Sequence, residues 1–389
     1  MSVNTMGYEQ AATLLNNIIT QATGAQSVQT VSPSDFVSVA NTALAAGYDK
    51  VLGAITQLVG RTLVSVRDYR GKFVDMELSD MEWGSIIRKL KIADVDWQDS
   101  AEFELVDGVA VDQWKVKKPN VLQLNFYGQN TFELQSPSVF MDQLDAAFSG
   151  PAELNRFVAG IGTTMANQRR QKDETVRRML ISNFIGGKIE ANNGVIHLLT
   201  EYNTETGQSL TATTVMAPAN FKDFVYWMYA RLETLAGLMS ERSQLFQINV
   251  TGKEINQFTD PANLRVKMYA PFMNAINARV RANTFANSYL QMAETEAINF
   301  WQSIETPNRI NVTPTYMDTS GQVITGSNVT ANDVIGIMYD RDAMGIVTQN
   351  ERVMQTPFNA RGHYSNIFWT YVQKWYSDFT EKAIVLKLD

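Results

Sequence analysis

The pattern of hydrophobic and polar positions opens with a polar segment and a helix. Residues 1–33 hold few apolar anchors, so we expect them to form a loosely held arm. Over residues 36–59 the apolar residues recur with the spacing of one helix face, and Gly60 is expected to end that helix. Residues 1–60 are therefore assigned to an N-terminal arm and helix.

The pattern becomes extended over residues 61–136. Leu122 and Phe126 belong to a run in which apolar and polar residues alternate, which predicts a strand with one buried face. Asp107-Gly108 lies between two short apolar runs and predicts a hairpin turn. The segment has too few apolar residues for a core of its own. We therefore expect it to project as an extended β loop that leans on another surface.

A long helix is predicted to begin at Pro151, where the missing N–H of proline costs little. Its apolar stripe starts at Leu154 and resumes in phase at Val176, with polar and basic residues in between. Gly186-Gly187 is expected to end it. A helix that is apolar at its ends and polar in its middle cannot be a buried rod, so it should bridge across a surface.

The remainder of the chain alternates helices with strands and closes on aromatic strands. Helical stripes and period-two runs between residues 218 and 333 predict a compact α/β unit. Residues 334–339 and 364–376 predict strands, and the second is apolar on both faces, which indicates burial on both sides. The pattern predicts an α+β fold. After residue 136 we expect three parts. They are a unit with the long helix at 137–217, the compact α/β unit at 218–333 inserted after it, and closing strands at 334–389 that complete the sheet beside the long helix.

Composition narrows the class of protein. The 389 residues exceed the roughly 250–300 at which one hydrophobic core stops growing, so two lobes are expected. Charged residues are 19%, below the usual ~25%, which suits a chain that hides surface against copies of itself. The net charge of −7 argues against a general nucleic-acid binder, and the lack of cysteine excludes disulfides and thiolate chemistry. No membrane span or signal pattern is visible, so we expect a protein made in the cytoplasm.

Candidate catalytic chemistry is sparse. No dinucleotide-binding or phosphate-binding loop is complete, and the only histidines are His197 and His363. His363 could act as an acid or base, but a structural hydrogen bond from a loop is the simpler interpretation. Asp340 and Asp342 could bind a metal together with Glu351, but a polar turn between strands is the favoured interpretation. We therefore expect a protein that is not an enzyme and has no cofactor.

A basic run in the long helix is a first candidate for intermolecular contact. Residues 169–178 hold five basic and two acidic side chains. One interpretation is a solvated helix face with internal i,i+4 ion pairs, and the other is a face toward nucleic acid. No aromatic residues are interleaved with the run, so a base-stacking platform is not indicated. The basic members are Arg169, Arg170, Lys172, Arg177 and Arg178.

The extended segment is a second candidate. Residues 73–107 hold ten acidic and three basic side chains, and three lysines follow shortly afterwards. Tryptophans on a projection without a core are either interface anchors or ordinary surface residues, and we favour neither on sequence alone. The residues expected to contact a neighbouring subunit are Trp83, Trp97, Asp107, Gly108, Trp114, Lys115, Lys117 and Lys118.

Taken in order, these parts resemble the major capsid protein of tailed double-stranded DNA phages. That protein has the Hong Kong 97-type fold, which herpesvirus floors and encapsulin shells share. Residues 118–121, 157–184 and 339–372 are similar to capsid proteins of small short-tailed phages. The resemblance covers the chain from about residue 34 onward and depends on the order and spacing of the parts, because no catalytic signature is involved.

The resemblance implies a fold with an N-terminal arm, an extended loop, a peripheral domain with a long spine helix, and an axial α/β domain at 218–333. It implies a virion protein that self-assembles into an icosahedral shell of pentamers and hexamers around double-stranded DNA. The alternatives are an encapsulin-like nanocompartment and, less favoured, another virion structural protein.

Several partners follow from the resemblance. The short N-terminal arm implies a separate scaffolding protein, and a portal protein is a further expected partner. A decoration protein is optional, and packaged DNA would make non-specific contacts. Some relatives cross-link a loop lysine to a neighbour's asparagine. Because Lys115, Lys117 and Lys118 lie at the base of the loop, we expect non-covalent assembly and no membrane partner.

Overall fold

The structure is a computed structural model of the whole chain. It describes residues 12–20 in part, 36–45, 47–65, 71–78, 86–95, 107–108, 120–135, 139–253, 255–279 and 295–389. No helix in these ranges is long and apolar enough to cross a membrane.

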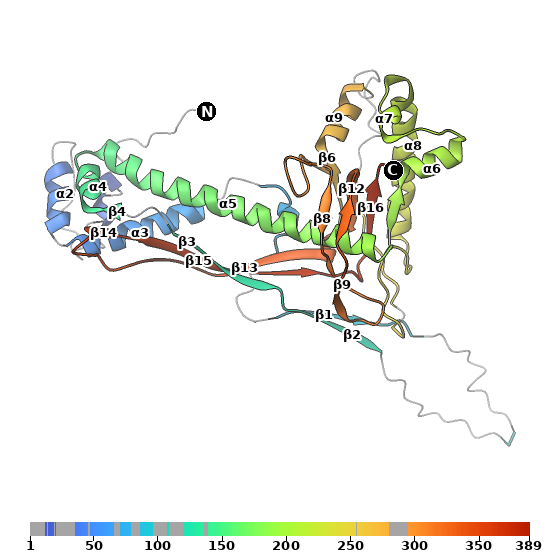
Figure 1. Cartoon of the computed structure of the whole chain (residues 1–389). Coiled ribbons are helices and arrows are strands. Elements are labelled where there is room, and N and C mark those ends of the chain that lie inside the picture. Colours follow the sequence, from blue (N-terminus) through green and yellow to red (C-terminus); the bar gives the residue numbers. More distant parts are fainter. Residues whose placement is uncertain are drawn as a thin grey trace.

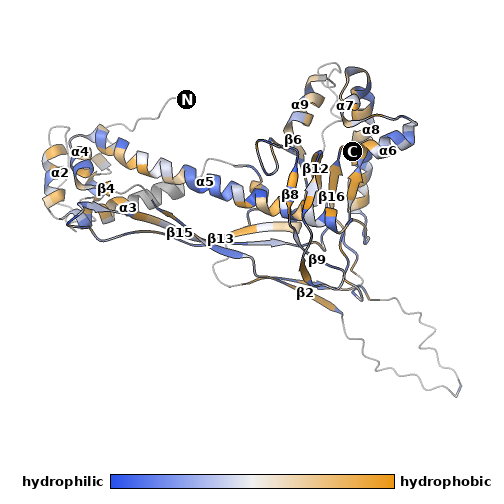
Figure 2. Ribbon diagram, viewed as in Figure 1, coloured by the Kyte–Doolittle hydropathy of each residue, from blue (hydrophilic) through white to orange (hydrophobic). Residues whose placement is uncertain are grey.

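One helix, α5 (Pro151–Glu190), runs between the two ends of the molecule (Figure 1). Leu154 and Met165 pack into a core at its N-terminal end, whereas Phe184 packs into a second core at its C-terminal end. The stretch between these cores is the most polar part of the helix (Figure 2). The predicted bridging helix is thus confirmed.

The predicted end of α5 at Gly186-Gly187 is wrong, because the helix continues to Glu190. Both glycines serve close packing. A Cβ added at Gly186 would lie 2.5 Å from Val312, and one at Gly187 would lie 2.7 Å from the ring of Phe379.

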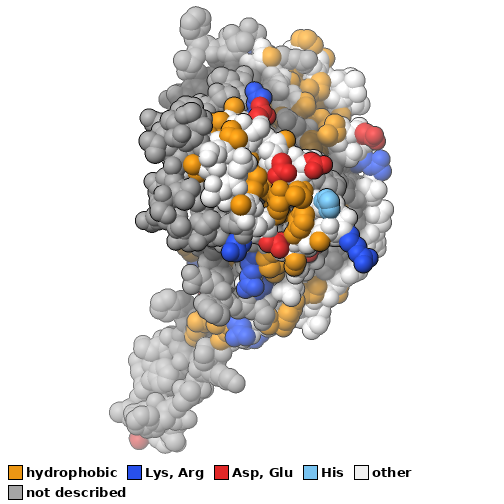
Figure 3. Space-filling model, turned by 90° about the vertical axis from the view of Figure 1, so that its left-hand side faces the viewer, with side chains coloured by type: hydrophobic (Ala, Val, Ile, Leu, Met, Phe, Trp, Pro, Cys, Tyr) orange, Lys and Arg blue, Asp and Glu red, His pale blue; other side chains and the backbone are white. Residues whose placement is uncertain are grey.

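The N-terminal end of α5 is covered by short helices (Figure 1). These are α2 (Phe36–Ala45), α3 (Tyr48–Ser65) and α4 (Met141–Ala147), with the ladder of β4 (Val139–Phe140) and β14 (Tyr364–Ser365) beside them. Figure 3 views the molecule toward this end, where hydrophobic and acidic side chains lie close together on the described surface. One helix ending at Gly60 was predicted here. The chain instead breaks at Gly47, whose φ of 115° is easy for glycine, and α3 runs past Gly60.

A three-stranded antiparallel sheet follows α5 along the molecule, in the order β13 (Met344–Gln355), β15 (Ile367–Ser377) and β3 (Gln129–Gln135) (Figure 1). In β15 the side chains of Trp369 and Tyr371 are buried, whereas Phe368 and Val372 are half-buried. The predicted burial on both sides is therefore only partly correct, since one face of this strand retains access to solvent.

A second sheet has five strands. Its order is β5 (Val195–His197), β16 (Ala383–Lys387), β12 (Val334–Asp340), β6 (Leu264–Tyr269) and β7 (Thr295–Ile298). The predicted closing strands are thus divided. β13 and β15 lie along α5, but β12 and β16 pair within the sheet of the inserted unit. The expectation that residues 334–389 complete a single sheet is wrong, because β12 is fully buried and finds its partner strand in β6.

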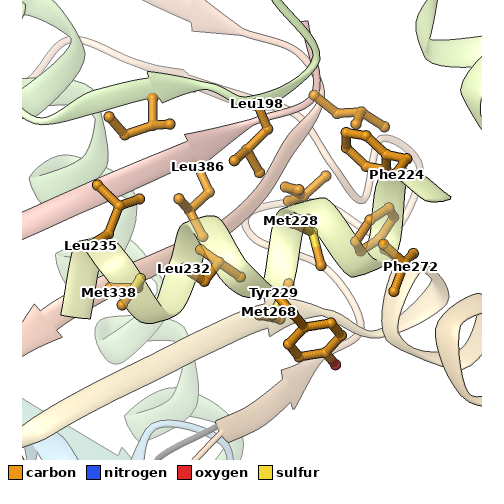
Figure 4. Close-up of a cluster of buried hydrophobic side chains, with 14 of the residues drawn as sticks. Leu198, Phe224, Met228, Tyr229, Leu232, Leu235, Met268, Phe272, Met338 and Leu386 are labelled. Atoms are coloured by element: carbon orange, nitrogen blue, oxygen red, sulfur yellow. The ribbon is translucent and has the colours of Figure 1, made fainter. Parts of the chain in front are cut away.

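Helices cover the five-stranded sheet. They are α6 (Leu198–Thr206), α7 (Ala212–Val215), α8 (Pro218–Ser240) and α9 (Ala270–Arg279). Figure 4 shows the resulting core, in which Leu232 and Leu235 of α8 lie against Met338 and Leu386 of the sheet. The helical stripes and period-two runs predicted between residues 218 and 333 are confirmed by α8 and by β6.

Short elements connect these units. They are η1 (Val74–Met76), β8 (Ile310–Val312), β9 (Thr315–Met317), β10 (Val323–Thr325), β11 (Val329–Ala331) and η5 (Arg341–Ala343). A further antiparallel ladder joins β1 (Ile87–Ile92) to β2 (Val121–Phe126). Leu122 and Leu124 of β2 are buried, as their alternation predicted.

Candidate functional site: the hub of the long helix and the base of the arm

The C-terminal part of α5 forms a hub, which we define as residues 169–190 with the side chains packed against them. Arg169 opens it. Its guanidinium stacks over the rings of Trp369 and Tyr371, at 4.3 and 4.7 Å from their centroids, and pairs with Asp173 and Glu351. Arg169 is therefore held within its own subunit.

Arg177 and Arg178 are buried, with 6% and 8% of their surfaces exposed. Arg177 pairs with Glu77 and donates to the backbone carbonyl of Lys72 at 3.2 Å. Arg178 pairs with Glu174 one turn earlier in the helix. The prediction of one solvated basic face needs a correction, because acidic and carbonyl partners from distant segments draw these two side chains inward.

The remaining two residues of the basic run lie closer to solvent. Arg170 is half-buried and donates to Asn167 at 3.2 Å. Lys172 is exposed, with its ammonium 4.9 Å from the centre of the Phe132 ring. Only Lys172 of the five predicted residues is exposed, so the run does not present a continuous basic surface for nucleic acid.

Two buried lysines hold the chain around the end of the hub. Lys188 is fully buried and donates to Asn193 Oδ1 at 3.0 Å and to the Phe246 carbonyl at 2.8 Å. Burial lowers the pKa of its ammonium to about 7. Lys382 is also fully buried and donates to the Glu241 carbonyl at 2.5 Å, directly after α8. Sequence reasoning missed both residues.

A short strap, residues 71–78, ties the hub to the inserted unit. Asp75 accepts from Lys267 of β6 at 2.5 Å and from the hydroxyl of Tyr339 at 2.8 Å. Lys267 also pairs with Glu296 of β7 at 2.8 Å. The strap therefore connects α5 with the five-stranded sheet through partly buried polar contacts.

The base of the arm, which we define as β1, β2 and residues 93–95, is fixed by a second group of charges. Lys89 donates to Asp378 at 3.1 Å and to the carbonyl of Asp342 at 2.5 Å. Lys91 lies 2.7 Å from Glu381 and 3.4 Å from Asp378. We call Lys89, Lys91, Asp378 and Glu381 the latch.

The latch holds a carboxylate that has no access to solvent. The side chain of Asp378 is fully buried. Burial by itself would raise the pKa of this carboxyl, but Lys91 and Lys89 hold the pKa below its ordinary value. Burial alone would lower the pKa of the Lys89 ammonium. The nearby carboxylates of Asp378 and Glu381 raise this pKa by more, so that it lies above its ordinary value. β1 and the turn between β15 and β16 are thus joined by charges that depend on each other.

The predicted loop contacts are described only in part. Asp107 and Gly108 form an exposed turn, and Gly108 has a φ of 81°, a left-handed value that glycine adopts easily. The remaining predicted contact residues lie outside the described residues. They are Trp83, Trp97, Trp114, Lys115, Lys117 and Lys118.

Of the residues considered for catalysis, His197 and Asp340 have side-chain partners and His363 is held through its backbone. Nδ1 of His197 lies 2.6 Å from the Asp389 carboxylate, and the backbone N–H of His363 donates to Asn359 at 2.7 Å. Asp340 accepts from the backbone N–H of Asp342 at 2.9 Å within a turn. Among the described residues no three histidine, cysteine or acidic side chains are grouped so that they could hold a metal ion.

Two solved capsid structures resemble the chain. A chain in the capsid of Staphylococcus phage Andhra has a TM-score of 0.53 and 8% identity, covering 82% of this chain and 84% of that one. A chain in the structure of the head fiber and inner core protein gp22 of native bacteriophage P68 has a TM-score of 0.53 and 8% identity, covering 83% and 88%. These likenesses show the Hong Kong 97-type fold. No curated protein matches the chain.

A family model described as Phi29-like phage major capsid protein matches residues 14–386, almost the entire chain. This match excludes the two alternatives from the sequence, an encapsulin-like nanocompartment and another virion structural protein. The family is structural and not enzymatic. The chain therefore belongs to the Phi29-like phage major capsid proteins, which build the icosahedral shell of a tailed double-stranded DNA phage virion.

Proposed function

We propose that the extended β loop, residues 61–136, is the main element by which each subunit docks on its neighbours within the pentamers and hexamers of the shell. We call this loop the arm; it is distinct from the N-terminal arm. The observation that carries this proposal is the latch. Because the charge of buried Asp378 depends on Lys89 and Lys91, the base of the arm cannot swing away without leaving that charge unpaired. A fixed base sets where the chain enters and leaves the loop, at residues 95 and 120.

Other surfaces have secondary roles in this proposal. The unit around α8 packs about the five- and six-fold positions, and α5 presents Lys172 at a subunit boundary or at the shell lining. In the arm, the tryptophans act as anchors and the lysines form ion pairs with the neighbour. The proposed contact residues are Trp83, Trp97, Asp107, Gly108, Trp114, Lys115, Lys117 and Lys118. Many modest contacts, repeated over a closed shell, give the particle its stability.

The proposed partners beyond the shell itself are a separate scaffolding protein, a portal protein, an optional decoration protein and packaged DNA. Their support is the resemblance of the chain to phage capsid proteins. DNA contact is proposed to be non-specific and weak, because the few exposed basic side chains along the described face of α5 would meet only phosphates.

The arm proposal is tested by removing the loop and keeping its base. The backbone N–H of Ala93 donates to the carbonyl of Asn120 at 2.8 Å, so a short Asn/Gly turn can close the hairpin in place of residues 96–119. We expect the shortened subunit to unfold at the same temperature as the full chain and to fail in shell assembly, as seen by electron microscopy. Normal shells from the shortened chain would contradict the proposal.

A further inference from the structure

Residues 89–92 of β1 reverse the usual polarity of a ladder, whereas β2 keeps it, with Leu122 and Leu124 buried. The side chains of Lys89 and Lys91 point inward to the latch, while alternate side chains of the same strand point outward. Leu90 and Ile92 are 63% and 67% exposed, and Val121 of β2 is 41% exposed. Ile92 is paired with Val121 across the ladder, so these apolar side chains are adjacent. A solvated ladder would normally place its lysines outside and its aliphatic residues inside.

The latch is what keeps this apolar face outside. A slip of one residue in β1 would turn Leu90 and Ile92 inward and carry the lysines into solvent. Such a slip would leave the buried Asp378 carboxylate without its two partners, which is strongly unfavourable. The chain therefore holds an aliphatic face in water by means of a buried ion-pair group. Nothing else among the described residues covers it, since the three side chains remain largely accessible.

We propose that this outward face, formed by Leu90, Ile92 and Val121, is buried against a second copy of the chain in the shell. The inference rests on the proposed function of the arm and adds a definite contact surface at its base. A second copy is the occupant because the protein belongs to a shell-forming family, in which each subunit is surrounded by copies of itself. The face also continues directly into the loop whose docking is proposed.

The size and charge of the face agree with this occupant. Three aliphatic side chains supply only part of the ~800 Å² per partner of a stable interface, so the face must form one section of a larger contact. Its cationic neighbours Lys89 and Lys91 are neutralised on the opposite side of the strand, which leaves only Arg88 as a charged residue on the outward side of β1. An uncharged aliphatic strip suits a repeated protein–protein contact in the shell.

The absence of cysteine from the chain allows a direct test by chemical labelling. Leu90→Cys places a single thiol on the outward face, and Asp107→Cys places one at the exposed turn of the arm. Each variant is labelled with a maleimide dye, once as dissociated subunits and once as purified shells that contain no other protein. We expect the thiol at position 90 to react at least about tenfold more slowly in shells.

The two positions separate this inference from the proposed function. If the thiol at position 107 is protected in shells but that at position 90 reacts as fast as in subunits, the face does not contact a copy and only this inference fails. If both thiols stay reactive in intact shells, the docking of the arm fails with it. Protection of position 90 that requires a second protein species in the particle would also overturn the inference.

A substitution pair covers the case in which the cysteine variants do not assemble. Leu90→Asp places a charge on the outward face, whereas Leu90→Met keeps its apolar character. We expect both free subunits to keep the thermal midpoint of the original chain, because the side chain points away from the latch. Leu90→Asp should raise the concentration needed for shell assembly at least about tenfold and Leu90→Met should not. Equal assembly of both variants would contradict the inference.

Discussion

The hub of α5 and the base of the arm both bury charge, but they differ in what surrounds it. At the hub, Arg177, Arg178 and Lys188 are enclosed by side chains and carbonyls of their own subunit. At the arm base, the lysines are enclosed on one side of β1 while aliphatic side chains stand in water on the other. The hub is complete in a single subunit, whereas the arm base is complete only in an assembly.

This difference divides the expected effects of substitutions into two classes. Changes at the hub or in the latch should lower the stability of the free subunit. Changes on the outward face should leave the free subunit intact and act on assembly. Three substitutions in the first class, taken from the largest expected effect to the smallest, test whether the buried charges and close contacts stabilise the subunit as described.

Asp378→Asn should have the largest effect, a loss of about 3 kcal/mol in the free energy of unfolding at neutral pH, because Glu381 is then the one carboxylate of the latch left for Lys89 and Lys91. Denaturant unfolding of the free subunit measures it. The depressed pKa of Asp378 means that its contribution is present above the ordinary value of 3.8 and is lost as the pH falls through the lower folded value.

The pH dependence gives this prediction a second readout. The difference between the original chain and Asp378→Asn should shrink as the pH falls below about 3.8, because the carboxyl is protonated first in the unfolded chain while the folded chain keeps its charge to a lower pH. Glu153→Gln is the matched control, because the ion pair of Glu153 with Arg156 is solvent-exposed and should contribute less than about 1 kcal/mol. A loss of the same size in both variants would show that the latch is no stronger than a surface pair.

Gly187→Ala should have the next largest effect, a loss of about 2 kcal/mol. Its new Cβ would lie 2.7 Å from the ring of Phe379, which is buried and stacked on Phe184 with ring centroids 4.6 Å apart. The control is Gly160→Ala in the same helix, where no atom lies within 4 Å of the new Cβ. It should stabilise the subunit by about 0.5–1 kcal/mol through helix propensity alone. Thermal unfolding of both variants measures the difference. Equal shifts of the unfolding midpoint would show that close packing does not explain the glycine at position 187.

Lys188→Met should have the smallest effect at pH 7 and a distinct effect above it. The pKa of Lys188 is lowered to about 7 in the folded protein, against an ordinary 10.5, so the unfolded chain binds more protons between these values. Stability from this group therefore rises with pH across that window, by at most about 1.4 kcal/mol per pH unit. The variant should lose this rise, as urea unfolding at a series of pH values will show.

A surface lysine provides the comparison for this slope. Lys222 lies exposed on α8, so Lys222→Met should retain the pH dependence of the original chain. If Lys188→Met retains the same slope as Lys222→Met, Lys188 is not buried in the way described.

The local pattern of apolar and polar residues was enough to predict those helices and strands whose buried face is set by their own sequence. The alternation around Leu122 predicted β2, and the two apolar stripes on either side of a polar middle predicted the bridging role of α5. A glycine, by contrast, has the same appearance in sequence whether it ends a helix or allows close packing. Gly186-Gly187 could not be interpreted correctly because the deciding neighbours, Val312 and Phe379, come from far along the chain.

The candidate site was harder to predict for the same reason. In β1 the alternation of lysine and aliphatic residues fits two registers equally well, and only the buried carboxylate of Asp378, about 290 residues away, selects the lysines for the inner face. Arg177 and Arg178 belong to a run that is typical of a solvated helix, but Glu77 and the carbonyl of Phe300 bind them inside. A charge pattern predicts exposure only when no distant partner is present.

The most direct test of the central claim is an electron cryo-microscopy reconstruction of shells assembled from the full chain, at a resolution that shows side chains. The account predicts that Leu90, Ile92 and Val121 contact an adjacent copy, while Lys89 and Lys91 remain paired with Asp378 of their own subunit. A reconstruction in which the outward face is open to solvent, or in which the lysines pair with a neighbour instead, would contradict it.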